Sequence, residues 1–481
     1  MKNILVNRRG MLAGFAGAAA LAATARHGIA QNIPLLRAVR RTLDVNGKAA
    51  SVFGLIGPDG RPGLDFQFAE PFRAHLQNET GLETLIHWHG LTPPTGQDGV
   101  PDISQPVLKD GESYDYHFGN TRTGTHFMHS HVGLQEQQLL AAPLIVRETK
   151  EPVFDEQEHV VIVHDFTFRV PAEILAELQK GGGMHAHHTM TGGTMDHSKM
   201  PGMTMPMPGM EMLNDVAFDA FLANDRTLAD PEVVQVEKGG RVRLRIINAA
   251  AASNMWIDLG SLTGELIAVD GSAVRAVAGN RFPLAIAQRA DIRILLPPEG
   301  GAFPILFQPE GLTSRTGIVL ATSGANIVRV AADAEKAAAA LDLSFEKSLR
   351  AVGQLPPEPV TRTEMLMLTG GEQNYQWGLN GKPSMHDTLF TVRQGERVDL
   401  MMHNMTGMAH PMHLHGHYFQ VVAVNGESIK GAIRDTVLVP PSETVTIRFD
   451  ANNPGTWALH CHHLYHMNSG MMGVMAYSSA A

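Results

Sequence analysis

The pattern of hydrophobic and polar positions predicts a protein built from short β-strands. The stretches EHVVIVHDF, VRLRIIN and ETVTIRFD alternate or run apolar, and they are rich in β-branched residues with Gly or Pro nearby. Residues 332–343, which are rich in Ala, are instead predicted to be helical. The sequence therefore predicts an all-β protein with little helix.

A loose repeat occurs three times along the chain. Its copies read FRAHLQNETGLETLIHWHGL, KGGRVRLRIINAAAASNMWIDL and QGERVDLMMHNMTGMAHPMHLHGH. Each copy has a polar turn, a strand that ends at Asn, a short loop and a second strand. Three copies predict three β-sandwich domains of related design. The middle copy has Asn254 to Ile257 where the others carry histidines, so we expect it to hold no metal.

Changes in composition predict where the domains begin and end. We expect domains at residues 31–150, 151–330 and 362–481, with a linker at 331–361 that ends in the Pro-rich LPPEPV. Residues 181–212, which are rich in Gly, Met and His, are predicted to be an exposed insertion within the second domain.

The first 30 residues predict an export signal. Arg8 and Arg9 precede the apolar run MLAGFAGAAALAA, and small residues follow it. Paired arginines are typical of the twin-arginine export machinery, with a general secretory signal or an uncleaved anchor as the alternatives. No later stretch has the ~18 consecutive apolar residues of a membrane helix. We expect a periplasmic protein with no membrane anchor after processing.

Composition narrows the chemistry. The 481 residues carry a formal charge of −10 without a basic stripe, which disfavours nucleic-acid binding. There are 24 His, 25 Met and a single Cys, and His and Met are both ligands for transition metals. The lone Cys461 cannot form an internal disulfide, which favours metal ligation or a reactive thiol. We expect the protein to be a monomer.

Four His-x-His pairs carry most of the chemical information. They are His87 and His89 in HWHG, His129 and His131 in HSH, His413 and His415 in HPMHLHGH, and His460 and His462 in HCH. Residues two apart on a strand point to the same face, so each pair presents two imidazoles in one direction. One pair alone has little meaning, but four pairs in the first and last repeats predict a metal centre.

The last pair has a second feature, because Cys461 lies between its two histidines. In an extended segment its side chain points away from both, so its thiolate serves a different metal. His466 and Met471 follow Cys461, and His410 begins the preceding motif. Two His, one Cys and a weak axial Met form the ligand set of a blue copper site. An electron on Cys461 then crosses one peptide unit to the flanking histidines.

At these residues the sequence resembles the multicopper oxidases, the family of laccases and bacterial cuprous oxidases, over essentially all of the chain after the signal. The resemblance implies three cupredoxin-like Greek-key β-sandwich domains. It also implies four copper ions that pass single electrons from a small substrate to O₂. It assigns to the type 1 copper His410, Cys461, His466 and axial Met471, to the type 2 copper His87 and His413, and to the type 3 pair His89, His129, His131, His415, His460 and His462.

The resemblance also implies a proton donor for the reduction of O₂. The family has an acid just after its first motif, and Asp98 in GQDGVP matches it. An ordinary turn Asp before Gly is the alternative. Some relatives have Glu directly after the last type 1 histidine. Here that position is Met467, so this part of the relay is absent or replaced. The axial Met471 resembles the bacterial members and implies a moderate oxidant.

The Met/His-rich insertion is a candidate for Cu(I) binding, because thioether sulfur is a soft ligand. Copper-handling members of the family have similar stretches. The candidate Cu(I) ligands are His185, His187, His188, Met203, Met205, Met207 and Met210, together with Met408 near the type 1 ligand His410. The alternatives are a low-complexity linker for the insertion and plain packing for Met408.

These observations favour an oxidase that acts on Cu(I), with laccase-like activity on phenols. A broad phenol oxidase or a Mn(II) oxidase is the alternative, although the sequence has no cluster of carboxylates for Mn(II). The alternative from another class of function is a periplasmic protein that sequesters copper without turnover. The complete set of paired histidines argues against it, because storage of copper does not need an O₂ site. A copper nitrite reductase would lack the paired type 3 histidines.

Overall fold

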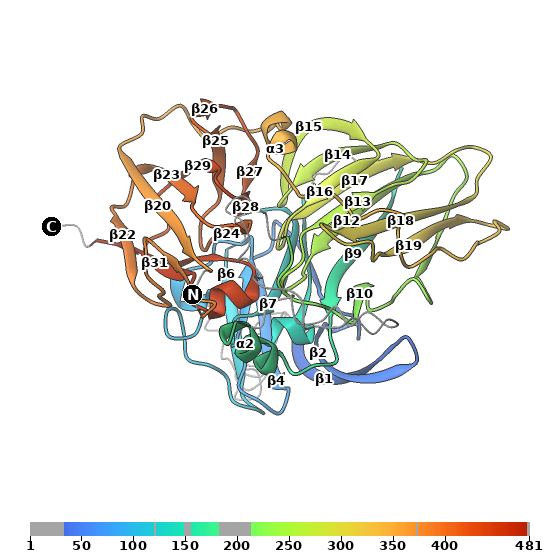
Figure 1. The fold of residues 1–481 in the computed structure, drawn as a ribbon, viewed down its shortest axis with the longest axis horizontal. Helices are drawn as coiled ribbons and strands as arrows, with labels where there is room; N and C mark the ends of the chain where they lie inside the picture. Colours follow the sequence, from blue (N-terminus) through green and yellow to red (C-terminus); the bar gives the residue numbers. More distant parts are fainter. Residues whose placement is uncertain (1–32, 120–121, 149–154, 182–212, 372–373, 479–481) are drawn as a thin grey trace, which may run out of the picture. The chain divides into compact units, whose positions relative to one another are not determined.

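The computed structural model describes residues 33–119, 122–148, 155–181, 213–371 and 374–478. The expected export signal and all but the first residue of the 181–212 insertion lie outside these residues. Within them the strands form six sheets, which group into three pairs along the chain (Figure 1). The all-β prediction is confirmed. No helix of the described part is long and apolar enough to cross a membrane.

The first domain is a sandwich of two four-stranded sheets, in the orders β2-β1-β4-β6 and β3-β8-β7-β5. Trp88 lies in its core, with ring centroids 4.8 Å from Phe72 and 4.6 Å from Tyr116. Its elements are β1 (Leu35–Val45), β2 (Lys48–Ile56), β3 (Leu64–Gln67), β4 (Phe72–Glu79), β5 (Ile86–His89), η1 (Thr95–Gln97), β6 (Ser113–Phe118), β7 (Gly124–Ser130), η2 (Glu136–Gln138) and β8 (Ala141–Arg147).

The second domain pairs a six-stranded sheet, β10-β9-β12-β17-β14-β15, with a five-stranded sheet, β11-β19-β18-β13-β16. Its core is aliphatic and aromatic, with Ile246, Ile292 and Phe307 fully buried. Its elements are β9 (Gln157–Phe166), α2 (Pro171–Gln179), β10 (Ala220–Ala223), β11 (Val233–Val236), β12 (Arg241–Asn248), β13 (Met255–Asp258), β14 (Gly264–Val269), β15 (Ser272–Gly279), β16 (Arg281–Leu284), β17 (Arg289–Leu295), β18 (Ala302–Pro309) and β19 (Thr316–Thr322).

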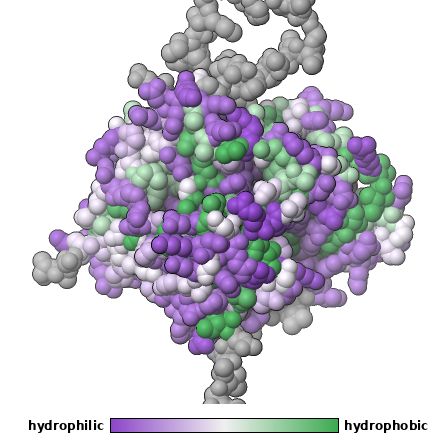
Figure 2. Space-filling model, turned by 90° about the horizontal axis from the view of Figure 1, so that it is seen from below, coloured by the Kyte–Doolittle hydropathy of each residue, from purple (hydrophilic) through white to green (hydrophobic). Residues whose placement is uncertain are grey.

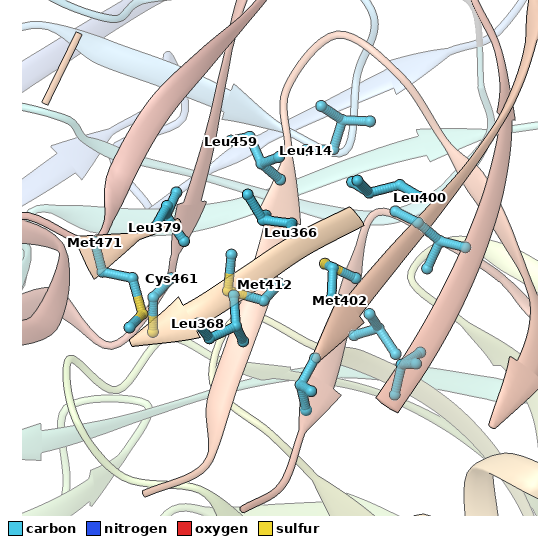
Figure 3. Close-up of a cluster of buried hydrophobic side chains, with 14 of the residues drawn as sticks. Leu366, Leu368, Leu379, Leu400, Met402, Met412, Leu414, Leu459, Cys461 and Met471 are labelled. Atoms are coloured by element: carbon cyan, nitrogen blue, oxygen red, sulfur yellow. The ribbon is translucent and has the colours of Figure 1, made fainter. Parts of the chain in front are cut away.

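The third domain pairs a seven-stranded sheet, β21-β20-β23-β29-β25-β26 with β27 beside β25, with the five-stranded sheet β22-β31-β30-β24-β28. Leu366, Leu400 and Met402 lie between the sheets (Figure 3). From the linker onward its elements are α3 (Ser344–Ser348), β20 (Arg362–Gly370), β21 (Trp377–Leu379), β22 (Thr388–Val392), β23 (Arg397–Asn404), β24 (His410–Leu414), β25 (Phe419–Val424), β26 (Glu427–Ser428), β27 (Ile433–Arg434), β28 (Thr436–Val439), β29 (Thr444–Asp450), β30 (Thr456–Cys461), α4 (Leu464–Asn468) and β31 (Met472–Tyr477).

The Asn of each repeat explains why the three domains share one design. Asn78, Asn248 and Asn404 each donate two side-chain hydrogen bonds, one to a carbonyl of the following loop and one to a carbonyl of a distant segment. The side-chain oxygen of each accepts the backbone N–H two residues later. An Asn side-chain amide therefore closes the equivalent loop in each of the three domains. It places the strand that follows, β5, β13 or β24, in the equivalent position.

The helix predicted at residues 332–343 is wrong, because this stretch has no helical turn. Its backbone N–H groups donate to another segment: Ala334 to the Thr313 carbonyl and Ala338 to the Leu312 carbonyl, while Leu341 donates to the carboxylate of Glu310. Tertiary hydrogen bonds replace the intrahelical ones, so the helix propensity of Ala is overridden.

Small apolar clusters join the three sandwiches. One joins the first and second domains through Phe127 and Ile247, and another joins the second and third through Ala285 and Leu438. A third cluster includes residues of all three domains, namely Val100 of the first, Ala251 of the second and Leu464 of the third. On the surface shown in Figure 2, hydrophilic residues predominate and hydrophobic ones form small separate patches. The apolar residues are thus used mainly within and between the sandwiches.

Candidate metal centre

Two pairs of strands bring the eight paired histidines together. In the first domain β5 and β7 are antiparallel neighbours, with His87 opposite His129. In the third domain β24 and β30 are antiparallel neighbours, with His413 opposite His460. None of the eight side chains is more than 7% exposed. The centre lies where the first and third domains meet, as the division of the pairs between two repeats predicts.

The ring nitrogens of these histidines form three close groups. The groups are His89, His129 and His462; His131, His415 and His460; and His87, His89 and His413. In each group the ligand atoms lie within 4.8 Å of one another, and each group has members from both domains. The arrangement has room for more than one metal ion, and neighbouring ions would lie between the same imidazole rings.

The ring nitrogens fit metal ions better than they fit one another. Nε2 of His460 lies 2.9 Å from Nε2 of His415 and 3.3 Å from Nε2 of His131. Nitrogens about 2.0 Å from a tetrahedral ion lie roughly 3.3 Å apart. Nε2 of His87 and Nε2 of His413 are buried without any hydrogen-bond partner among the described residues. Buried polar atoms are rarely left unpaired, so these nitrogens are suited to hold a metal.

In several of these histidines the opposite ring nitrogen is fixed by a hydrogen bond to the protein. Nδ1 of His87 donates to the Asp98 carbonyl and Nδ1 of His413 donates to the Asp435 carbonyl, both at 2.8 Å. Nδ1 of His460 donates to the Cys461 carbonyl at 2.9 Å. A proton held on Nδ1 leaves the lone pair on Nε2, directed into the centre, which is the form that a metal requires.

Burial keeps the imidazoles of the centre neutral. Desolvation, strengthened by the neighbouring imidazoles, holds the pKa of His413, His415 and His462 well below the usual value. The same effects lower the pKa of His131, and they bring the pKa of His460 to about 3. Each neutral imidazole therefore keeps one unprotonated ring nitrogen that can bind a metal at neutral pH.

Three carboxylates contact this centre, those of Asp98, Glu136 and Asp435, and only Asp98 was predicted. Oδ2 of Asp98 accepts a hydrogen bond from Nδ1 of His415 at 2.8 Å, while Oδ1 is buried without a hydrogen-bond partner among the described residues. Gly99 permits this turn, because a Cβ there would lie 1.8 Å from a carbonyl oxygen of β5. The second carboxylate, Glu136, lies 3.4 Å from Nδ1 of His129 and belongs to no motif that the sequence reveals.

Cys461 belongs to a separate cluster. Its Sγ lies 3.5 Å from Nδ1 of His410 and 3.9 Å from Nδ1 of His466, and these two nitrogens are 3.2 Å apart. The backbone N–H of Cys461 donates to the carbonyl of Met471, which brings the two sulfur-containing side chains together (Figure 3). All four residues lie in the third domain. The two neighbours of Cys461, His460 and His462, belong to the other groups, as strand alternation predicts.

The surroundings of this cluster hold its ligands in place. Thr406 Oγ1 lies 2.7 Å from Nε2 of His410, and the ring of Trp377 packs on His466 with centroids 4.0 Å apart. Burial raises the pKa of the Cys461 thiol. Burial also lowers the pKa of His466 to about 3, so its imidazole is neutral at neutral pH. A neutral imidazole is the form that can bind a soft metal ion beside the sulfur.

Asp215 of the second domain contacts this cluster, which the sequence did not indicate. Its carboxylate accepts hydrogen bonds from Nε2 of His466 and Nε2 of His463, each at 3.2 Å, and from the hydroxyl of Tyr375. Burial alone would raise the pKa of Asp215, but His463 and His466 lower it to a net value well below normal. The carboxylate is thus an ionised acceptor at neutral pH.

Among the remaining predicted residues, the structure describes Met408 alone. Met408 is 3% exposed and packs within the core of the third domain, which is the environment of a packing residue. His185, His187 and His188, with Met203, Met205, Met207 and Met210, lie outside the described residues.

The chain matches three family models described as multicopper oxidase, at residues 45–151, 157–331 and 356–481. It is 29% identical over 402 residues to the multicopper oxidase MmcO of Mycobacterium tuberculosis, covering 82% of this chain and 77% of that protein. It is 24% identical to copper resistance protein A of Escherichia coli, covering 90% of this chain and 88% of that protein.

Among solved structures, the laccase from Botrytis aclada is similar in fold. The TM-score is 0.75 at 20% sequence identity, over 92% of this chain and 87% of the laccase. The predicted cupredoxin-like architecture is confirmed, and the three family matches follow the three sandwiches. The chain therefore belongs to the multicopper oxidase family, and it is an oxidoreductase with copper cofactors that uses O₂ as its electron acceptor.

Proposed function

We propose that this protein oxidises Cu(I) in the periplasm and that it holds four copper ions in two separate sites. The proposal assigns His410, Cys461, His466 and axial Met471 to a type 1 copper. It assigns His87 and His413 to the type 2 copper, and the other six paired histidines to the type 3 pair. One observation carries this assignment. The Cys461 side chain belongs to one cluster, whereas its neighbours His460 and His462 belong to the groups of paired histidines.

The backbone around Cys461 connects the two sites. Copper held by these residues would supply one-electron chemistry, with four electrons from the donor needed for each O₂. One peptide unit on each side joins Cys461 to His460 and His462. His460 also donates its Nδ1 proton to the Cys461 carbonyl at 2.9 Å, which provides a second, hydrogen-bonded connection. The chain therefore offers a short and rigid path from the sulfur to the three-copper centre.

Asp98 is the proposed proton donor. Reduction of one O₂ to water consumes four protons, and a buried centre needs a group that holds and releases them. The Asp98 side chain is 2% exposed, its Oδ2 is fixed by His415, and its Oδ1 has no hydrogen-bond partner among the described residues. That oxygen lies 3.3 Å from Nδ1 of His87 and is the proposed proton carrier beside the centre.

Cu(I) is the favoured substrate because of the Met/His-rich insertion and because of two relatives named copper resistance protein A. Thioether sulfur is a soft ligand that selects Cu(I), and imidazole also binds copper. Relatives named laccase favour phenols as a second class of substrate. The proposed type 1 site suits either donor, since it takes one electron at a time.

Deletion of residues 184–212 tests the choice of substrate. We expect the rate of Cu(I) oxidation to fall roughly tenfold or more while the rate with a phenol stays within about twofold, because the deletion removes soft ligands but not the proposed copper sites. Both rates are measured as O₂ consumption by copper-loaded protein. A matched variant that replaces Met203, Met205, Met207 and Met210 by Leu keeps the length of the chain. Unchanged Cu(I) rates in both variants would exclude the insertion as a Cu(I) site.

A further inference from the structure

The second domain supplies none of the eight paired histidines, yet one of its side chains reaches the three-copper centre. Arg289, at the start of β17, has no solvent-exposed surface. Its two terminal nitrogens bind the two carboxylate oxygens of Asp435 in the third domain, with NH1 2.7 Å from Oδ1 and NH2 2.5 Å from Oδ2. This two-pronged contact fixes both the position and the plane of the carboxylate.

Asp435 and its neighbour Thr436 hold two of the proposed copper ligands. Oδ1 of Asp435 lies 3.0 Å from Nε2 of His89, and its backbone carbonyl accepts the Nδ1 proton of His413 at 2.8 Å. The hydroxyl of Thr436 lies 3.1 Å from Nε2 of His89 and 3.2 Å from Nδ1 of His413. One dipeptide thus orients a ligand of the first domain and a ligand of the third.

His89 is oriented differently from its neighbours. His87, His413 and His415 hold their Nδ1 protons against the protein and direct Nε2 to the centre. In His89 the contact with Asp435 is made by Nε2, and Nδ1 is the buried atom without a hydrogen-bond partner among the described residues. A lone pair on Nδ1 requires the proton on Nε2, so this orientation depends on a fixed acceptor opposite Nε2.

We infer that Arg289 is a positioning residue of the three-copper centre. It holds the Asp435 carboxylate where that group fixes the tautomer and the ring orientation of His89. Arg122 of the first domain adds a weaker contact to Asp435, at 3.5 Å. The second domain therefore acts on the copper centre through this guanidinium, and its neighbour Gln288 donates to the Thr436 carbonyl at 3.2 Å. The inference rests on the proposed assignment of His89 and His413 as copper ligands.

Arg434 provides a matched control, because it is a buried arginine of the same ion-pair network. It binds Asp270 and Glu346 at 2.9 Å each, whereas its guanidinium has no recorded contact with the Asp435 carboxylate. Asp270 in turn accepts the backbone N–H of Arg289 at 2.9 Å. Replacement of either arginine leaves a buried carboxylate with a lost partner, and we expect both to lower stability. Only the replacement of Arg289 is expected to change the three-copper centre.

The test compares Arg289→Gln and Arg434→Gln as copper-loaded full-length proteins. Copper per chain, the blue absorbance and the type 2 electron paramagnetic resonance signal are measured for each. For Arg289→Gln we expect normal blue absorbance, a type 2 signal reduced by half or more, and fewer than four copper ions per chain. For Arg434→Gln we expect a lower melting temperature but four copper ions and a normal signal. Unchanged copper and signal in Arg289→Gln, or equal losses in both variants, would overturn the inference.

Two further measurements keep the inference testable. If Arg289→Gln does not fold, Arg289→Lys replaces it, since Lys keeps the buried charge but cannot make the two-pronged contact. The same selective loss at the three-copper centre is expected, and a normal type 2 signal would overturn the inference. The unaltered protein tests the assignment separately, because four copper ions with both blue and type 2 signals are required of it whatever Arg289 does.

Discussion

The two proposed copper sites are built in opposite ways. The type 1 ligands His410, Cys461, His466 and Met471 lie within 62 consecutive residues of one domain, and Thr406 and Trp377 of that domain hold two of them. The three-copper centre takes its imidazoles from two domains and its hydrogen-bonded supports from all three. All four ligands of the first site belong to one sandwich, and among the described residues only Asp215 of the second domain forms a hydrogen bond with them from outside it. The three-copper centre forms only when the sandwiches pack together, so we expect it to be more sensitive to substitutions in other parts of the chain.

The largest expected effect comes from Cys461→Ser, which removes the link between the sites. We expect loss of the blue absorbance and of turnover with any donor, because a hydroxyl is a poor ligand for a soft copper ion. The three-copper centre should survive, since its imidazoles do not depend on the sulfur. Copper analysis should therefore give three ions per chain, with the type 2 resonance retained. Oxidation of substrates at the normal rate would contradict the assigned path.

The difference between the two sites also explains what the sequence could predict. The alternation of His460, Cys461 and His462 is local, so strand geometry alone could predict that their side chains belong to different clusters. The supports come from distant segments: Asp435 lies 346 residues from His89, and Asp215 lies 251 residues from His466. Such contacts depend on how the domains pack, which no local pattern encodes. The failed helix at residues 332–343 has the same cause, because contacts with a neighbouring segment override propensity.

A smaller effect, confined to the three-copper centre, is expected from Asp98→Asn. The amide keeps the shape of the side chain but cannot supply a proton, so the O₂ step should slow roughly 100-fold, as is common when a general acid is lost. Reduction of the blue copper without O₂ should be unchanged. Stopped-flow measurement of bleaching and of colour return separates the two steps. Asp102→Asn, an exposed aspartate four residues later, is the control. Equal slowing of both steps would exclude a role in proton delivery.

The smallest effect is expected at the type 1 site, from Asp215→Asn. The ionised carboxylate accepts the Nε2 proton of His466 at 3.2 Å, which makes the imidazole a stronger donor and favours the oxidised copper. Removal of the charge should therefore raise the type 1 potential, by on the order of 50 mV if about 1 kcal/mol is lost.

Redox titration of the blue absorbance measures this shift, and the type 2 signal should stay constant. Asp219→Asn is the matched control, because Asp219 accepts hydrogen bonds from Thr167 and Phe168 and contacts neither proposed site. A lowered potential in Asp215→Asn would contradict the proposed stabilisation of the oxidised copper, and an unchanged potential would show that the second domain leaves the type 1 site untouched. The type 1 site would then be local in its supports as well as in its ligands, and the contrast with the assembled centre would be complete.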